Sequence, residues 1–222
     1  MLLWQTQIMQ NVYFISGLGA SKKAFSFLDL SFCIPIFIEW IEPLNNESLP
    51  NYAQRLTAQI KKPNAIVVGL SFGGMLATEI AKNNPKMKVI LISSNKTHTE
   101  FPKLLKIGKY IPAYQWLPNN SMKKSSNFFA WLLGAKGKEQ RMIQQQIARD
   151  TNPAFTKWAI YAILHWNNTI IPSNIVHIHG TADKLLPYRL VKVDYTIEGG
   201  EHLMIMDKAK EVSSLLKQLL EV

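Results

Sequence analysis

Eight residues, Val67-Val68-Gly69-Leu70-Ser71-Phe72-Gly73-Gly74, predict a short apolar strand that runs into a Gly-x-Ser-x-Gly turn and then directly into a helix. The flanking sequence agrees, because residues 64–68 are rich in β-branched side chains and residues 74–81 have helical character up to Asn84-Pro85. We therefore expect Ser71 to lie at the tight corner between the strand and the helix.

A serine at such a corner suits nucleophilic chemistry. Its hydroxyl is a weak nucleophile at neutral pH and must be held where a general base can take its proton. Gly69 and Gly73 have no side chains where the corner is tight, so the turn places Ser71 at the carboxyl edge of the sheet. The N–H of Phe72 can then face a developing oxyanion at the positive end of the helix. The alternative is an ordinary glycine-bounded turn whose serine has no chemical role.

Length and composition indicate one globular unit. The chain has 222 residues, of which 47% are hydrophobic, a share that is normal for a globular protein and argues against disorder. The single cysteine, Cys33, excludes a disulfide framework within the chain. Residues 1–7 lack the pattern of a secretory signal, and no run of about 18 apolar residues is present. We expect a cytoplasmic protein without a membrane span.

The chain is basic. It carries 25 lysines and arginines against 15 acidic residues, a formal charge of +10. Such a charge favours anionic partners through long-range steering, but a solvated basic surface explains it equally well. Lysines, among them Lys123 and Lys124, are interleaved with aromatic residues between residues 97 and 169. Because no nucleic-acid-binding motif accompanies them, we expect no nucleic-acid partner.

Strands alternate with helices in the first 96 residues and again after residue 169. This alternation predicts a mostly parallel, doubly wound α/β sheet that is covered on both faces. The final helix has Asp207 as its expected N-cap. Strands are expected at 11–15, 34–40, 64–68, 88–94, 174–179 and 193–197, and further helices at 24–30, 51–60 and 74–81.

The alternation is interrupted between residues 97 and 169. Helical patterns at 140–149 and 154–164 are separated by prolines there, and no convincing strand is found. We expect residues 1–96 and 170–222 to form the α/β core and residues 97–169 to form a helical cap or lid that is inserted into it.

The loop Gly17-Leu18-Gly19 follows the first expected strand. It lacks the third glycine of a dinucleotide-binding fingerprint and the Gly-Lys-Ser/Thr of a phosphate-binding loop. We interpret it instead as the source of a second oxyanion donor, the N–H of Leu18.

Three polar residues are expected at the carboxyl ends of three different strands: Ser71, Asp183 and His202. Active sites of open parallel sheets lie along that edge. Glu100 is an alternative to Asp183 as the acid. His177 and His179 are two residues apart on an expected strand and could form a metal pair, but no carboxylate or cysteine cluster accompanies them. No metal is therefore expected.

The chain order Ser, Asp, His resembles that of the α/β-hydrolase superfamily. Residues 69–73 match the nucleophile elbow of that family, residues 179–183 its His-Gly-x-x-Asp segment and residues 199–202 its Gly-Gly-x-His loop. The helical insertion stands where the family carries its lid. Ser16-Gly17 stands where relatives usually have His-Gly. Only about ten residues precede the first expected strand, so the antiparallel strands that open the family's sheet should be shortened or absent.

The resemblance implies a serine hydrolase that needs no cofactor and cleaves a small-molecule ester or thioester. His202 would take the proton of Ser71, Asp183 would hold the imidazole, and the N–H groups of Leu18 and Phe72 would stabilise the oxyanion. The same triad can serve C–C hydrolysis, lyase or acyl-transfer chemistry, and a ligand receptor of low turnover can also carry it.

The substrate and the oligomeric state stay open at this point. The aromatic, lysine-rich insertion suits a substrate with an apolar tail and an anionic handle. A lid over neutral esters is the alternative.

Overall fold

A central parallel sheet organises the protein. The computed structural model describes residues 9–122, 127–135 and 137–220. Within them, six strands lie in the order β2-β1-β3-β4-β5-β6, and every neighbouring pair is parallel. The expected α/β class is confirmed, and the described residues contain no antiparallel opening strand. The strands are β1 (Asn11–Ile15), β2 (Ile34–Phe37), β3 (Ile66–Leu70), β4 (Lys88–Ile92), β5 (Ile175–Gly180) and β6 (Tyr195–Ile197).

The register of the strands brings their carboxyl ends to one edge. Ile15 of β1 pairs with Gly69 of β3, and Leu70 pairs with Ile92 of β4, which in turn pairs with Ile178 of β5. The loops that follow these strands therefore begin side by side. This edge holds all the residues that the sequence singles out for chemistry.

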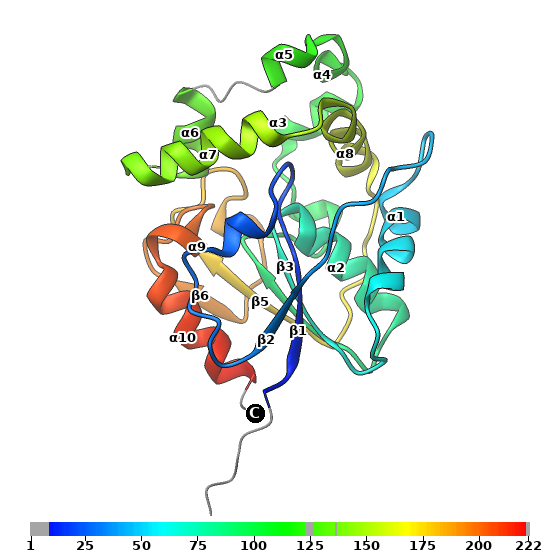
Figure 1. Cartoon of the computed structure of the whole chain (residues 1–222). Helices are drawn as coiled ribbons and strands as arrows, with labels where there is room; N and C mark the ends of the chain where they lie inside the picture. Colours follow the sequence, from blue (N-terminus) through cyan, green and yellow to red (C-terminus); the bar gives the residue numbers. More distant parts are fainter. Residues whose placement is uncertain (1–8, 123–126, 136, 221–222) are drawn as a thin grey trace, which may run out of the picture.

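Each face of the sheet has its own hydrophobic core, because successive side chains of a strand point to opposite faces. Tyr13 and Ile15 belong to one core and Val12 and Phe14 to the other. Helices α1 (Leu49–Leu56), α2 (Phe72–Asn83) and α8 (Pro153–His165) supply the first core; α9 (Met204–Asp207) and α10 (Ala209–Leu220) supply the second. Figure 1 shows the two groups of helices on opposite sides of the strands.

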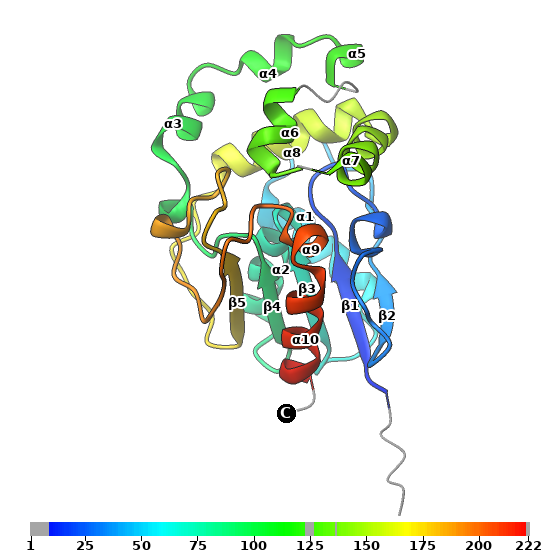
Figure 2. The ribbon, with the colours of Figure 1, turned by 90° about the vertical axis from the view of Figure 1, so that its left-hand side faces the viewer.

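The helices between β4 and β5 cover the carboxyl edge of the sheet (Figures 1 and 2). The two ends of this segment are tied together by Asn168. The backbone N–H of His98 donates to the carbonyl of Asn168 over 2.9 Å, and the Asn168 side chain donates to the carbonyl of Lys96 over 2.7 Å. The chain thus leaves and re-enters the core at one place. Besides α8, the helices are α3 (Lys103–Lys106), α4 (Ala113–Trp116), α5 (Asn119–Met122), α6 (Asn127–Leu133) and α7 (Lys138–Asp150).

Two expectations about helices are wrong. Residues 24–30 form no α-helix; a 3₁₀ turn, Lys22–Phe25, is followed by irregular chain. The N–H of Asp29 donates to the Ser213 hydroxyl of α10 over 3.0 Å. This backbone N–H is therefore not available for a hydrogen bond within a helix. Asp207 ends α9, whereas α10 begins at Ala209. The chain makes this extra turn because residues 204–206 are all buried.

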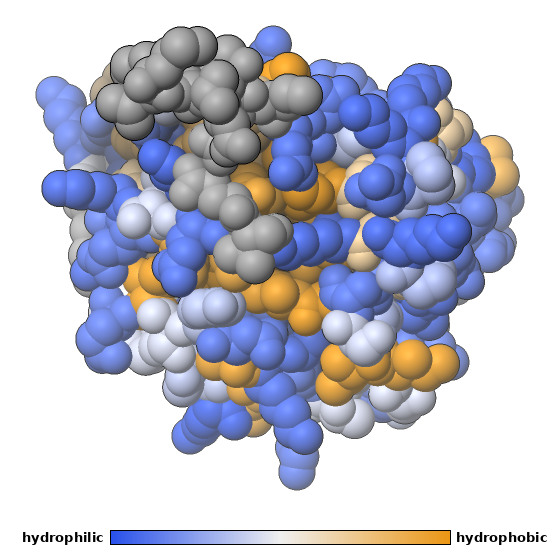
Figure 3. All heavy atoms as spheres, turned by 90° about the horizontal axis from the view of Figure 1, so that it is seen from below, coloured by the Kyte–Doolittle hydropathy of each residue, from blue (hydrophilic) through white to orange (hydrophobic). Residues whose placement is uncertain are grey.

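None of the helices in the described ranges is long and apolar enough to cross a membrane. Figure 3 shows the end of the molecule opposite the helical segment. It is mostly hydrophilic, with small hydrophobic areas between the polar side chains.

Candidate active site

Ser71 lies at the corner between β3 and α2 in a strained backbone conformation. Its φ and ψ are 51° and −116°, a region that costs a non-glycine residue about 1–3 kcal/mol. Two hydrogen bonds hold the corner: the N–H of Ser71 donates to the carbonyl of Ile92 over 2.9 Å, and the Ser94 hydroxyl donates to the carbonyl of Ser71 over 2.7 Å. The neighbouring strand β4 and the loop after it therefore fix the position of Ser71.

The glycines on either side of Ser71 are required by close backbone contacts. A Cβ atom on Gly69 would collide with the backbone of Gly73 and Gly74. A Cβ atom on Gly73 would collide with the carbonyl oxygens of Ile15 and Ser16. The Gly-x-Ser-x-Gly pattern thus lets the start of α2 pack directly against β3 and the end of β1.

The structure brings Ser71, His202 and Asp183 into one hydrogen-bonded line. Ser71 Oγ lies 2.9 Å from His202 Nε2, and His202 Nδ1 lies 2.8 Å from Asp183 Oδ2. His202 follows β6 and is 2% exposed, and Asp183 follows β5 and is 4% exposed. Ser71 is partly exposed.

The Asp183 carboxylate is held in its charged form. Burial opposes its ionisation, but the charge of His202, the hydrogen bond from His202 and the contribution of His179 outweigh burial and lower the pKa of Asp183 below its ordinary value. Its second oxygen, Oδ1, accepts from the N–H groups of Leu185 and Leu186 over 2.9 and 2.8 Å. The loop from Asp183 to Leu186, called the acid loop below, therefore binds the Asp183 carboxylate through its own backbone N–H groups.

The loop after β1 lies beside the serine. A Cβ atom on Gly17 would be 3.6 Å from the Cβ of Ser71, so Leu18 follows directly at the site. The Ser16 hydroxyl and the Trp40 indole both donate to the carbonyl of Ala20, each over 2.8 Å, and close this turn. The contact of Trp40 is not indicated by any spacing in the sequence, because Trp40 lies 20 residues after Ala20.

The N–H of Phe72 is at the first position of α2, where a helix offers no internal acceptor. It points from the positive end of a 12-residue helix, next to Ser71. The two expected oxyanion donors, Leu18 and Phe72, thus belong to loops that meet at the serine.

The alternative acid, Glu100, is engaged elsewhere. Its carboxylate accepts from the backbone N–H groups of Lys96 and Lys192 over 2.5 and 3.1 Å. Glu201, next to His202 in sequence, accepts from the ammonium group of Lys184. Asp183 is therefore the carboxylate that contacts His202. In the described part of the chain, no group of three or more metal-ligating side chains occurs.

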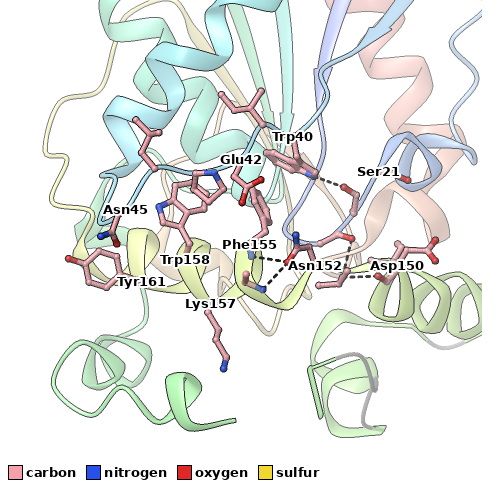
Figure 4. A pocket seen from close by; sticks show the side chains of 18 of the residues that line it. Ser21, Trp40, Glu42, Asn45, Asp150, Asn152, Phe155, Lys157, Trp158 and Tyr161 are labelled. Carbon is pink, nitrogen blue, oxygen red and sulfur yellow. Dashed lines mark hydrogen bonds between the residues drawn. The ribbon is translucent and has the colours of Figure 1, made fainter. Parts of the chain in front are cut away.

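A pocket of about 680 Å³ lies beyond the loop after β1, between that loop, residues 40–46 and α8. Figure 4 shows Trp40, Phe155 and Trp158 together along one wall, with Tyr161 further out on α8. The ring centroids of Trp40 and Phe155 are 5.1 Å apart. The triad residues do not line this pocket; Gly19 and Ala20 do, two and three residues beyond Gly17, which lies beside Ser71.

The sequence matches one known protein family, and the fold is shared by several solved structures. The family described as "Alpha/beta hydrolase family" matches residues 13–215. No curated protein sequence matches at a significant level.

Several solved structures share the fold over nearly the whole chain. A lipase-esterase related protein from Clostridium acetobutylicum has a TM-score of 0.68 at 17% identity, over 94% of this chain and 93% of its own. An esterase from Thermogutta terrifontis has a TM-score of 0.70 at 14% identity, over 96% and 89%. A meta-cleavage product hydrolase from Pseudomonas fluorescens has 0.63 at 15%, over 96% and 90%. At such identities the similarity establishes the fold alone.

Proposed function

This chain belongs to the alpha/beta hydrolase family, and we propose that it cleaves a small-molecule carboxylic ester or thioester through an acyl-enzyme on Ser71. The observation that carries the proposal is the continuous line of hydrogen bonds from Ser71 Oγ through His202 to Asp183. A buried acid, an oriented imidazole and a strained, accessible serine are the parts that acyl transfer needs.

The geometry fixes the tautomer of His202. Because the Asp183 carboxylate is an acceptor without a proton, His202 Nδ1 carries the hydrogen and Nε2 is free to accept. Nε2 takes the proton of Ser71 as Oγ attacks the acyl carbon, and then gives it to the leaving alcohol or thiol. The N–H groups of Leu18 and Phe72 stabilise the oxyanion. Water repeats the sequence on the acyl-enzyme and releases the acid.

Labelling with a fluorophosphonate probe tests the nucleophile. We expect one modified residue, Ser71, in the mass map of the digested protein, and no label on the Ser71→Ala variant. The Ser31→Ala variant is the control and should still be labelled at Ser71, because Ser31 is exposed and lies in the loop before β2. A label on another residue of the folded protein, or none, would contradict the mechanism.

A panel of acyl esters and thioesters of graded chain length tests the reaction class. Turnover that Ser71→Ala removes supports the hydrolase. Tight binding of the esters without turnover would instead indicate a ligand receptor. Product analysis with an added alcohol acceptor separates hydrolysis from acyl transfer, and an absence of ester turnover together with rapid labelling would redirect the search to C–C hydrolysis or lyase chemistry.

We propose that the helical segment 97–169 acts as the lid and that the pocket of Figure 4 holds the part of the substrate remote from the scissile bond. Its wall of Trp40, Phe155 and Trp158 suits an apolar group. The pocket also begins where the loop that carries Leu18 ends. A chain that extends from an ester at Ser71 past this loop would enter it.

The charges around the pocket favour a neutral substrate. Glu42 and Asp150 line it together with Lys157, so the lining carries no excess of positive charge. The pair Lys123 and Lys124 lies outside the described residues. Rising salt should therefore leave kcat/KM for a neutral ester unchanged. A fall of kcat/KM with salt for an otherwise matched anionic ester would instead support an anionic handle.

A further inference from the structure

Two histidines of β5 stand directly behind the acid. His177 and His179 are both fully buried, and their rings meet edge to face with centroids 5.1 Å apart. His179 Nδ1 lies 3.2 Å from His177 Nε2. Neither residue takes part in the mechanism above, yet two adjacent imidazoles in a hydrophobic sheet are costly unless their nitrogens are used.

The other ring nitrogen of His179 faces the acid loop. Nε2 lies 2.8 Å from the carbonyl oxygen of Leu186 and 3.3 Å from Asp183 Oδ2. Both oxygens are acceptors without a proton, so Nε2 carries the hydrogen whatever the charge of the ring. The Nε2–H of His179 donates to the carbonyl of Leu186, and Asp183 Oδ2, which is hydrogen-bonded to His202, lies 3.3 Å from the same nitrogen.

We propose that His179 is a positioning residue for the acid: its Nε2–H holds the carbonyl of Leu186, and with it the loop whose N–H groups bond Asp183 Oδ1, so that Oδ2 faces His202. His177 holds the ring of His179 from behind. This inference rests on the triad role proposed for Asp183. It goes beyond that role because it names a residue, His179, that contacts neither the substrate nor the reacting atoms. His179 acts only through Asp183.

The surroundings of the pair support this role. Burial lowers the pKa of both histidines below the ordinary value. The other charged groups that act on the pair are Glu100 and Lys96. Lys96 donates from Nζ to the carbonyl of Lys192 over 2.5 Å, and this carbonyl also lies 3.1 Å from His177 Nδ1. The pair is therefore anchored at both ends.

Two amide side chains separate positioning from packing. In His179→Gln the amide nitrogen can reach the place of Nε2 and donate to the carbonyl of Leu186. In His179→Asn the shorter side chain replaces only Nδ1 and can contact only His177. Both variants are neutral, polar and smaller than histidine, so a purely structural role would affect them alike. The melting temperature of each variant shows whether it is folded.

We expect His179→Asn to lower kcat by about 10- to 100-fold with little change in KM, because a misplaced acid costs rate rather than substrate binding. His179→Gln should recover most of the loss. His177→Phe, which keeps the packing behind the ring, should fall between them. Equal losses in the Asn and Gln variants, or an unchanged kcat in His179→Asn, would overturn the proposal.

A second readout needs no substrate. The hydrogen-bonded Nδ1–H proton of His202 should give a low-field NMR signal in the wild-type protein and in His179→Gln. It should shift or disappear in His179→Asn. If the protein turned over no ester at all, the proposed function would fail, but this signal would still decide whether His179 holds Asp183 against His202. An identical signal in all three proteins would overturn the inference.

Discussion

The ammonium nitrogen of Lys184 lies 2.5 Å from Oε2 of Glu201, and this ion pair joins the residue after the acid to the residue before the base. The Glu201 side chain is only 2% exposed, whereas that of Lys184 is 31% exposed. The loop that carries Asp183 and the loop that carries His202 are thus linked by an ion pair.

Lys184 also contacts the helical segment between β4 and β5. Lys184 Nζ lies 5.3 Å from the ring centroid of Trp131 in α6, and the N–H of Leu203 donates to the carbonyl of Leu133 over 3.1 Å. A Cβ atom on Gly134, which has a φ of 82°, would collide with the Glu201 side chain. The end of α6 is therefore seated on the loop that carries His202.

Removing the cation from this pair should destabilise the protein. We expect Lys184→Met to lower the free energy of unfolding by about 2 kcal/mol, below the range for fully buried pairs because Lys184 is partly exposed. Lys23→Met is the matched control, since the Lys23–Asp150 pair is exposed on both sides and should cost about 0–1 kcal/mol. Urea unfolding measures both. Equal changes in the two variants would show that the burial of Glu201 has no energetic consequence.

The serine and the histidine should act as a unit. Ser71→Ala and His202→Ala should each lower kcat for the best ester by about 10³- to 10⁶-fold, because either change removes the proton transfer on which attack depends. The double variant should lose little more than the single ones. Steady-state kinetics on all three proteins provide the comparison; losses that multiply would mean that one of the two residues acts independently.

Exchange of the acid should affect rate more than structure. Asp183→Asn should lower kcat by up to about 10⁴-fold, because an amide that donates to His202 Nδ1 favours the wrong tautomer. Glu100→Gln should leave kcat nearly unchanged but lower the melting temperature, since its amide would face backbone N–H groups that now bond a carboxylate. The reverse pattern would move the role of the acid to Glu100.

Stability should fall as the pH falls through the range in which free histidine titrates. Burial holds the pKa of His177 well below, and that of His179 below, the ordinary value of 6.5. Below that pH the unfolded chain binds protons that the folded chain does not, which costs up to about 1.4 kcal/mol per histidine and pH unit. The lowered pKa of Asp183 adds a further loss only below its ordinary value of 3.8.

Urea unfolding between pH 7.5 and 5.5 measures this slope. His177→Phe should reduce this slope, because the variant lacks one of the two buried histidines that bind a proton in the unfolded chain but not in the folded chain. A slope that is the same in the wild type and His177→Phe would show that the buried pair does not contribute.

A bulky residue in the pocket should change the choice of substrate. Ala154 lines the pocket and is exposed, so Ala154→Trp should fill space without disturbing the core. We expect KM for long-chain esters to rise about tenfold, the effect of about 1.4 kcal/mol of lost contact, and KM for an acetate ester to stay unchanged. Ala113→Trp, on the exposed face of α4, is the control. An unchanged preference would place the acyl or alcohol group elsewhere.

The sequence was most informative where the structure is local. The elbow could be predicted because Gly69 and Gly73 meet backbone atoms only a few residues away or on the neighbouring strand. β1 and β4 are short β-branched runs, and β1 matches its expected bounds. Because parallel strands end at one edge, the common location of Ser71, Asp183 and His202 could also be anticipated; their roles remain predictions.

The rest depends on contacts between distant parts of the chain. The place of His179 beside Asp183 follows from the way the acid loop turns back to Leu186, which no spacing encodes. Ser94 meets Ser71 only because β3 and β4 are neighbours. Helices α3, α4 and α5 are four residues each, too short to give a helical repeat in the sequence. Helices α4 and α5 pack on α8, a contact that no periodicity in these short segments indicates.

The tie at Asn168 has a consequence for how this chain can change. Lys96 and Asn168 are hydrogen-bonded to each other, so the 71 residues between them leave and re-enter the core at the same place. If these residues were removed, the two remaining chain ends would already be neighbours. A linker of a few residues could bridge them at little entropic cost. The helices between β4 and β5 could therefore be exchanged as one segment, and such an exchange would change which molecules reach Ser71.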